Sequence, residues 1–462
     1  MNHNRWATVF GAMVIGIAAA AGAGDLVVDG AVATTGGWYE FADGSTQSSA
    51  AYPRWAQVAV VDIQGRGDYT DPTTAMAALP AWCGTPSLSN PCLVKILPGW
   101  YDIGTSNVVM QPHVDIEGSG RNATFVRAAS SAAVVYGANN AELRSLSVIN
   151  DGVGGFPQGV RVDGAHRSPR ITDVDVVVSG IGTGTVGVNL VDSEPVVDSI
   201  TVRVTGGDTV GIMIANRTAV LRNVDVYVTD GGSAKGIVFT QSAGMVEDAD
   251  VHVTPVTGGI AVGIELTHES SPLLRDSRVY VSDADHSYGI KSTFSNPLVK
   301  GVTVAVERGD QGWGFENHGG TATLANSSIK VLGGWSATGV HADSGNTTLR
   351  DVHIDVGEAS GSNTGVASGA SAQVKIEQVK ITANGGVYSY AVDNGGGSDT
   401  ALINVTAEAK AASTYNWGVV NQDIAVITAT NLIAKASGGT GSYGVLNAGT
   451  GGTVTVDLSL IH

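Results

Sequence analysis

Four ionisable side chains recur at nearly constant intervals in the second half of the sequence. Glu265, Lys291, Glu316 and His341 follow one another at intervals of 25 or 26 residues. If each interval is one coil of stacked strands, the two glutamates lie two strand spacings apart, about 9–10 Å, on one face. Carboxyl groups about 6.5–9.5 Å apart suit a general acid and base that invert a glycosidic centre. Lys291 between them suits neutralisation of a uronic acid or the base of a lyase, so all four residues are catalytic candidates.

The same pattern also has a structural explanation. Opposite charges on neighbouring strands attract, so a file of alternating charge is expected on a solvated outer face. An enzyme needs a groove with convergent, partly shielded ionisable groups, whereas a charge ladder needs only a flat face. We favour the ladder and keep a polysaccharide lyase or glycoside hydrolase as the alternative.

A second column is aromatic and stands directly before a recurring Gly or Ala. It consists of Tyr288, Trp313, Tyr390, Trp417 and Tyr443. A row of exposed rings suits stacking against sugars, which makes the last four residues glycan-stacking candidates. Valine holds the position in three earlier repeats. The column also stands two residues before the inward residue that follows the glycine, so strict alternation puts both on the same side of the strand. Inward stacking is therefore the favoured prediction, although Lys235 in the same column keeps the exposed arrangement open.

A group of acidic residues in predicted loops suggests a weak cation site. It consists of Asp283, Asp285, His286, Glu307 and Asp310. Carboxylate oxygens are suitable ligands for Ca²⁺, but no known calcium-binding motif is present. A solvated loop surface is the favoured interpretation. We expect no other cofactor and no metal centre.

These columns belong to an internal repeat. A Gly followed by an apolar residue recurs from Gly159 to Gly444, with Ala391 once in its place, and eleven intervals of about 26 residues separate these ends. A polar column keeps the same irregular spacing: Ser145, Asp173, Ser199, Asn223, Asp248, Asp276, Gly301, Asn326, Asp351, Gln378, Asn404 and Asn431. Such side chains satisfy backbone groups at turns and tolerate unusual backbone angles. We therefore predict a turn ladder there rather than catalytic carboxylates.

The pattern within each repeat predicts the fold. Runs such as 174–178 and 352–356 alternate with a period of two, as strands do. About 26 residues suffice for three short strands and three turns. We therefore predict an all-β chain over residues 111–462, a single-stranded right-handed parallel β-helix of about a dozen rungs. Its hand follows from the strong bias of parallel crossovers, and no rung should be stable alone.

The first 110 residues differ from the repeat. Residues 1–23 combine a basic start, an apolar stretch and a small-residue end, as in a secretory signal peptide, with an uncleaved membrane anchor as the alternative. Residues 24–52 read as an extended segment with a turn at Asp43-Gly44. Residues 53–110 should form an N-terminal cap and the first rung.

Two local features are expected within the cap. Asp71 is suited to cap a short helix over residues 73–79, and Pro80 should end that helix. Cys83 and Cys92 are the chain's two cysteines. In an exported protein such a pair favours one local disulfide, with two free buried thiols as the alternative.

Two segments resemble known families. Residues 39–47 (YEFADGSTQ) resemble the F-P-D-G-T-x-Q segment near the start of phage tail-fibre and bacterial surface proteins, with Ala42 where proline is usual. Over residues 73–126, a short helix and the turns "PGWY" and "GSG" are similar to the opening rungs of the pectate-lyase and pectinesterase superfamily. This resemblance implies a parallel β-helix. The catalytic motifs of pectinesterases, polygalacturonases and pectate lyases are missing, so no active-site residue carries over.

Composition and charge narrow the function. With 42 acidic and 25 basic residues, the net charge of −17 disfavours nucleic acid and anionic membranes as partners. We expect an extracellular or cell-surface location, with the periplasm as alternative. The favoured function is a secreted or surface β-helix with a structural, adhesin-like or glycan-contacting role and no catalysis. Expected partners are a polysaccharide or cell surface and, through unpaired strand edges of the C-terminal coil, another copy or chain.

Overall fold

The computed structural model describes residues 39–40, 46–47, 55–164, 169–180, 182, 184–255, 258–457 and 460–461. The chain divides into two compact units, Met1–Ala56 and Gln57–His462. In the first unit, β1 (Tyr39–Glu40) pairs antiparallel with β2 (Thr46–Gln47), as expected for two extended pieces joined by a turn. The predicted signal peptide and the turn itself lie outside the described residues. Within the described ranges, no helix has the length and apolarity needed to cross a membrane.

The second unit begins with β3 (Gln57–Val61) and two short helices, α2 (Pro72–Ala77) and α3 (Leu79–Trp82). Asp71 caps α2 as predicted, since its carboxylate accepts a hydrogen bond from the Thr74 backbone N–H at 2.8 Å. The prediction that Pro80 ends the helix was wrong. Pro80 stands in the first turn of α3, where the N–H that proline lacks would have no helical partner anyway.

One disulfide ties these helices to the coil. Cys83 follows α3 directly, and Cys92 begins the next strand. The two residues form a disulfide with Cα atoms 6.2 Å apart, and both are buried. The predicted local disulfide is confirmed, and the alternative of two free thiols was wrong.

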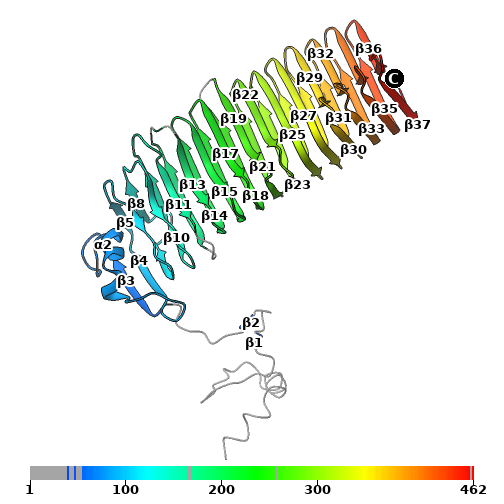
Figure 1. Cartoon of the computed structure of the whole chain (residues 1–462). Coiled ribbons are helices and arrows are strands. Elements are labelled where there is room, and N and C mark those ends of the chain that lie inside the picture. Colours follow the sequence, from blue (N-terminus) through cyan, green and yellow to red (C-terminus); the bar gives the residue numbers. More distant parts are fainter. Residues whose placement is uncertain are drawn as a thin grey trace, which may run out of the picture. The chain divides into compact units, whose positions relative to one another are not determined.

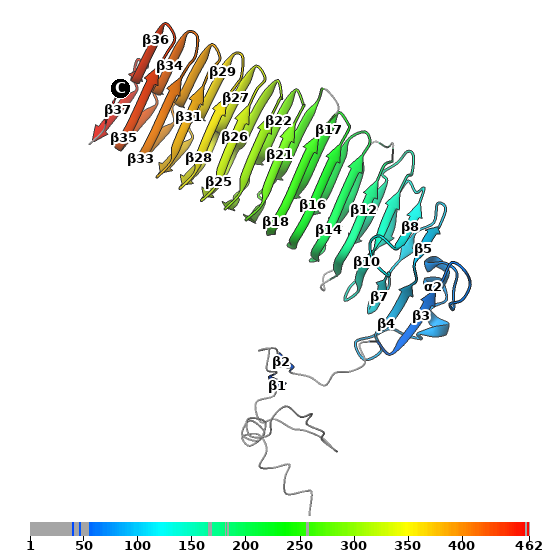
Figure 2. The ribbon, with the colours of Figure 1, turned by 180° about the vertical axis from the view of Figure 1, so that it is seen from behind.

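The rest of the unit is a coil of parallel strands with three faces, which we name A, B and C (Figures 1 and 2). Face A begins with β3, β4 (Cys92–Ile96) and β7 (Val114–Glu117), followed by the first parts of five long strands, β10 (Glu142–Asn150), β12 (Arg170–Val178), β14 (Val196–Thr205), β16 (Ala219–Thr229) and β18 (Ala243–Thr254). It continues with the short strands β20 (Ser271–Arg275) and β23 (Leu298–Lys300) and with the second parts of β25 (Gln311–Ala325) and β27 (Ser336–Arg350). It ends with β30 (Gln373–Glu377), the first parts of β33 (Asp399–Lys410) and β35 (Val426–Ser437), and β37 (Thr453–Asp457).

Face B follows face A in each coil. It contains β5 (Gly99–Asp102), β8 (Thr124–Ala128), the second parts of β10, β12, β14, β16 and β18, β21 (Arg278–Ser282), β24 (Thr303–Glu307), β26 (Ser328–Leu332), β28 (His353–Gly357), β31 (Lys380–Asn384), the second parts of β33 and β35, and β38 (Leu460–Ile461).

Face C completes each coil. It contains β6 (Val108–Val109), β9 (Ala133–Tyr136), β11 (Gln158–Asp163), β13 (Thr185–Val191), β15 (Thr209–Ala215), β17 (Ser233–Thr240), β19 (Ile260–Thr267), β22 (His286–Thr293), the first parts of β25 and β27, β29 (Ser362–Ser368), β32 (Tyr388–Asn394), β34 (Tyr415–Asn421) and β36 (Gly441–Asn447). These strands pair in parallel from one coil to the next, and their spacing confirms the predicted β-solenoid with a period of about 26 residues.

The polar column forms the turn between faces A and B, as predicted. Its twelve members all have a positive φ, between 47° and 67°, a conformation that Asn, Asp and Gly tolerate best. At the C-terminal end, the Asn431 side-chain amide donates a hydrogen bond to the Asn404 side-chain oxygen at 2.8 Å. The aspartates of this column therefore serve the turn.

The core is a set of stacked apolar columns. On face C, successive coils contribute side chains with no exposed surface: Ile237, Ile264, Ile290, Phe315, Val340 and Val366. Burying each such side chain stabilises the fold by roughly 1.5–3 kcal/mol relative to leaving it in water. Each coil covers the next, so the outer surfaces of the three faces are left for function.

Candidate functional site

The four predicted catalytic candidates lie in one outward file on face C. Glu265 is in register with Lys291, Lys291 with Glu316, and Glu316 with His341. All four residues are partly exposed, while the residues immediately before them in the strand are buried. The sequence spacing therefore places them correctly on neighbouring strands.

Both glutamates of this file are paired with basic side chains. Lys235 donates a hydrogen bond from Nζ to Glu265 Oε2 at 2.6 Å. Glu316 lies between Lys291, with Nζ at 3.7 Å, and His341, with Nδ1 at 3.6 Å. Such alternation is what a charge ladder requires, and exposed pairs of this kind stabilise a fold by at most about 1 kcal/mol. Catalysis by these residues stays a prediction.

The aromatic column points outward, so the prediction of inward stacking was wrong. Ile290 is fully buried, whereas Tyr288, two residues earlier in the same strand, is only partly buried. The glycine between them explains the difference, because a Cβ on Gly289 would lie 2.2 Å from Val304 Cγ1. Gly289 and Ile290 thus both face the core. This irregularity shifts the alternation by one residue in neighbouring strands alike, so the strands stay in register across it.

The rings of this column stack along the coil. Tyr288 and Trp313 are parallel to within 6°, with centroids 4.6 Å apart, and Lys291 Nζ lies 4.2 Å from the centre of the Tyr288 ring. Burial, with a smaller contribution from Glu316, raises the pKa of Tyr288 to about 12. Both rings of this pair are only partly exposed. This favours a structural role for the pair.

A larger group of rings lies on β32 and β34 and is named the aromatic cluster: Tyr388, Tyr390, Tyr415 and Trp417. Tyr390 and Trp417 stack at 4.5 Å, and Tyr388 lies parallel to Tyr415 at 6.4 Å. Tyr388 is 39% and Tyr415 37% exposed. Sequence reasoning missed these two tyrosines. They stand two residues before the predicted column, and the alternation would have located them once that column was known to face outward.

A carboxyl group adjoins the aromatic cluster. Asp393, also on β32, is partly buried and accepts a hydrogen bond from Gln422 Nε2 at 2.6 Å. Burial raises the pKa of Asp393, and the charge of Asp423 adds to this effect. Burial, followed by the charge of Asp393, raises the pKa of Tyr390 to about 12. The indole N–H of Trp417 is buried and has no hydrogen-bond acceptor in the described part of the chain.

Replacing Asp393 with asparagine is expected to stabilise the protein at neutral pH. Because the folded-state pKa of Asp393 is raised, ionising its carboxyl group costs stability as pH rises above the ordinary value of 3.8. At pH 7 the free energy of unfolding of the variant should be higher than that of the wild type, and this difference should disappear near pH 3. Urea unfolding at the two pH values measures it, with Asp208→Asn, at an exposed aspartate, as control. Equal stability of variant and wild type at pH 7 would contradict the argument.

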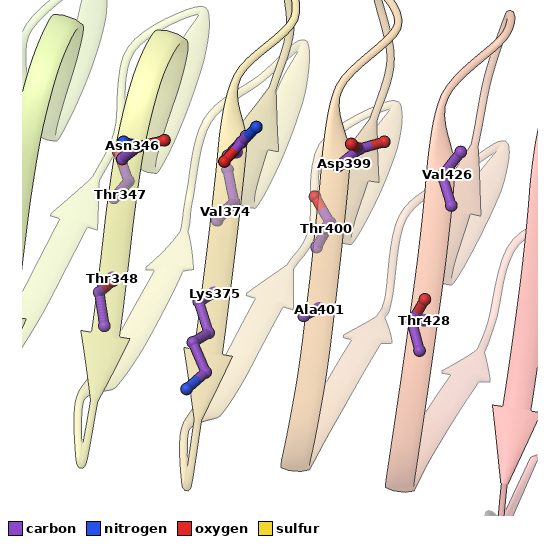
Figure 3. Close-up of a pocket in the computed structure, with 11 residues that line it drawn as sticks. Asn346, Thr347, Thr348, Val374, Lys375, Asp399, Thr400, Ala401, Val426 and Thr428 are labelled. Atoms are coloured by element: carbon purple, nitrogen blue, oxygen red, sulfur yellow. The ribbon is translucent and has the colours of Figure 1, made fainter.

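A cavity of about 640 Å³ lies on face A in the same coils as the aromatic cluster. Its lining comes from four neighbouring strands, β27, β30, β33 and β35 (Figure 3). The lining residues are Asn346, Thr347, Thr348, Gln373, Val374, Lys375, Asp399, Thr400, Ala401, Val426 and Thr428. Sequence reasoning singled out none of them, because they read as ordinary strand residues and form no chemical motif.

The acidic residues predicted to bind calcium mostly have protein partners. Asp283 accepts a hydrogen bond from Arg308 at 3.0 Å, and Glu307 accepts one from the Tyr280 hydroxyl at 3.3 Å. Asp285 accepts one from the Gly259 backbone N–H at 3.3 Å. Over the described ranges, no three His, Cys, Asp or Glu side chains are grouped so as to hold a metal ion. Weak calcium binding here stays a prediction.

Comparisons with known proteins return β-helix structures. No protein-family model and no curated protein matches the chain. Among solved structures, the A-module of mannuronan C-5 epimerase AlgE4 from Azotobacter vinelandii is 13% identical, with 85% of this chain and 94% of that one covered and a TM-score of 0.36. Pectin methylesterase PemA from Erwinia chrysanthemi is 13% identical, with 55% and 81% covered and a TM-score of 0.34. The catalytic unit of an α-1,3-glucanase from Streptomyces thermodiastaticus is 17% identical, with 89% and 70% covered and a TM-score of 0.31. At these identities the similarity is one of fold alone.

Proposed function

We propose that this protein is an extracellular or cell-surface β-helix that binds a polysaccharide through the aromatic cluster on face C and does not cleave it. The observation that carries the proposal is the grouping of four rings from two neighbouring strands beside a hydrogen-bonded carboxyl–amide pair. Apolar ring surface with a few fixed polar groups is the usual composition of a ligand site.

The chemistry of the cluster suits a sugar chain. Tyrosine and tryptophan combine a large apolar ring with a polar tip, so they contact both the C–H groups and the hydroxyl groups of a sugar. The Asp393 carboxyl and the Gln422 amide provide an acceptor and a donor at the edge of the rings. Tyr443, on the next strand of face C, is 43% exposed and extends the aromatic surface.

A polysaccharide lyase or glycoside hydrolase acting through Glu265, Lys291, Glu316 and His341 is the second candidate. The contacts of Glu316 with both Lys291 and His341 favour it, because they bring an acid and two bases together. The same contacts pair the Glu316 carboxylate with basic side chains on both neighbouring strands, which favours a structural charge ladder. Release of reducing or unsaturated ends from a polysaccharide by the purified protein would support the enzyme and overturn the non-enzymatic proposal.

The test is polysaccharide binding by the full chain, measured by affinity electrophoresis and calorimetry on a panel of plant, algal and bacterial polysaccharides. We expect binding to at least one of them. In the double variant Tyr388→Ala/Trp417→Ala, affinity should fall about tenfold or more, equivalent to about 1.4 kcal/mol or more.

The matched control is Trp100→Ala. Trp100 is 58% exposed and stacks on Phe125 at 4.3 Å, on face B near the N-terminal end of the coil. It should leave affinity unchanged. Binding that survives the double variant, or that is lost equally in the control, would count against the aromatic cluster as the site.

Self-association of the last coil belongs to the same proposal. Val456 on β37 is 38% exposed, whereas Ala429, in register with it on the preceding coil, is buried. Pairing of this strand with another copy stays a prediction.

A further inference from the structure

The cavity on face A has polar groups that the protein itself leaves unused. Asn346, Gln373 and Asp399 are in register on three neighbouring strands, and Thr428 lies on the fourth strand of the cavity. All four are exposed. Their side chains take part in no hydrogen bond within the part of the chain that the structure describes. Amide, hydroxyl and carboxylate groups in this arrangement complement the hydroxyl groups of a ligand.

The charge of the cavity selects among such ligands. Lys375 is the one basic residue of the lining, and its Nζ lies 2.5 Å from Glu377 Oε1. The pKa of Glu377 is lowered by the hydrogen bond from Lys375, with a smaller contribution from Arg350. The ammonium group of Lys375, the positive charge of the lining, is thus already paired with Glu377, while the Asp399 carboxylate is exposed. An acidic sugar chain would meet an unpaired negative charge in a protein whose net charge is −17.

The position of the cavity links it to the aromatic cluster. β32, which carries Tyr388 and Tyr390, is followed after a four-residue turn by Asp399 at the start of β33. β34, which carries Tyr415 and Trp417, is followed after a similar turn by Val426 at the start of β35. Both surfaces therefore belong to the same coils, on faces joined by these turns, although Tyr388 and Tyr415 stand at the far ends of their strands from the turns.

From these observations we infer that the cavity on face A is a second glycan subsite, and that the glycan is uncharged. The inference rests on the proposed function and names the class of its ligand. The four lining strands span three steps of about 4.8 Å, roughly the length of a two- to three-unit sugar segment lying across the strands. Asn346, Gln373 and Thr428 bind its hydroxyl groups, and Asp399 accepts hydrogen bonds from them.

The experiment compares neutral polysaccharides (a glucan, a mannan and a xylan) with acidic ones (polygalacturonate and alginate) on the full chain. The wild type should bind a neutral polysaccharide more tightly than either acidic one. The variant Gln373→Ala/Thr428→Ala should weaken that binding about fivefold or more, since each of the two lost hydrogen bonds contributes about 0.5–1.5 kcal/mol. Asp399→Lys should raise the affinity for the acidic polysaccharides.

The control is Thr303→Ala/Ser328→Ala, which removes two neutral polar side chains from face B and should leave affinity unchanged. If Tyr388→Ala/Trp417→Ala abolishes binding while Gln373→Ala/Thr428→Ala does not change it, the subsite is wrong and the proposed function stands. Tighter binding of an acidic polysaccharide overturns the ligand class. If no polysaccharide binds, the proposed function fails and the inference with it.

Discussion

Replacing Gly314 with alanine is expected to lower the free energy of unfolding by about 1–3 kcal/mol, the usual cost of forcing an extra methyl group into a packed core. The added Cβ would lie 2.2 Å from Ile329 Cγ2 and 2.6 Å from the Gly339 carbonyl oxygen. The strand cannot move away easily, because its neighbour carries a glycine at the same place with the same kind of contact. Chemical denaturation of the full chain, followed by circular dichroism, measures the change.

The control is Gly369→Ala. A Cβ at Gly369 meets no atom within 4 Å, and the residue does not have a positive φ. This variant should stay within about 0.5 kcal/mol of the wild type, as most surface substitutions do. If Gly314→Ala is equally harmless, close packing is not the reason for the glycine column, and the glycines do not occupy inward positions of their own.

The fold could be predicted because every coil has the same structural requirements, so the same residue types recur at the same position of each repeat. Each turn between faces A and B needs a residue that tolerates a positive φ, and Asp173, Asn223 and Asp351 meet that need in different coils. Each strand also needs alternating apolar residues to cover the coil before it. Two columns with the same irregular spacing therefore determine the coil, even though no single repeat is informative.

The orientation of the aromatic column could not be predicted by the same route. Strict alternation puts Tyr288 and Ile290 on one side of the strand, and only packing shows that Gly289 takes an inward position of its own. A glycine has no side chain whose polarity could reveal this. The outward position of the charged file was predicted correctly because Ile290 faces inward and alternation resumes at Lys291.

The cavity and the raised pKa of Asp393 could not be predicted from the sequence for another reason. Gln373, Asp399 and Thr428 are polar residues on outward positions, as in any solvated sheet, and their grouping depends on which strands lie side by side. Burial raises the pKa of Asp393, and the charge that adds to this effect comes from Asp423, in the next coil. Such properties belong to the assembled coil, and the sequence of one repeat does not contain them.

Asn421→Ala is the other substitution with a large expected effect, roughly 2–4 kcal/mol, because it leaves buried polar groups without partners. Asn421 has no exposed surface. Its amide donates hydrogen bonds to the Ala425 carbonyl at 2.8 Å and to Asn447 at 2.9 Å, and its oxygen accepts one from Asn394 at 2.7 Å. Denaturation of the full chain measures the loss. The control is Asn447→Ala at the exposed end of the same ladder, where water replaces the lost partner and the cost should be below about 1 kcal/mol.

The asparagine ladder also connects stability with the proposed binding surface. Asn394 accepts hydrogen bonds from Ser398 at 2.7 Å and from Thr400 at 2.6 Å, so it holds the corner that leads from the aromatic cluster to the cavity. Removal of Asn421 takes away an acceptor of the Asn394 amide and should loosen that corner. We therefore expect Asn421→Ala to weaken polysaccharide binding below its unfolding temperature, while Asn447→Ala leaves binding intact. Equal losses of stability in the two variants would show that burial of the ladder is not what makes it stabilising.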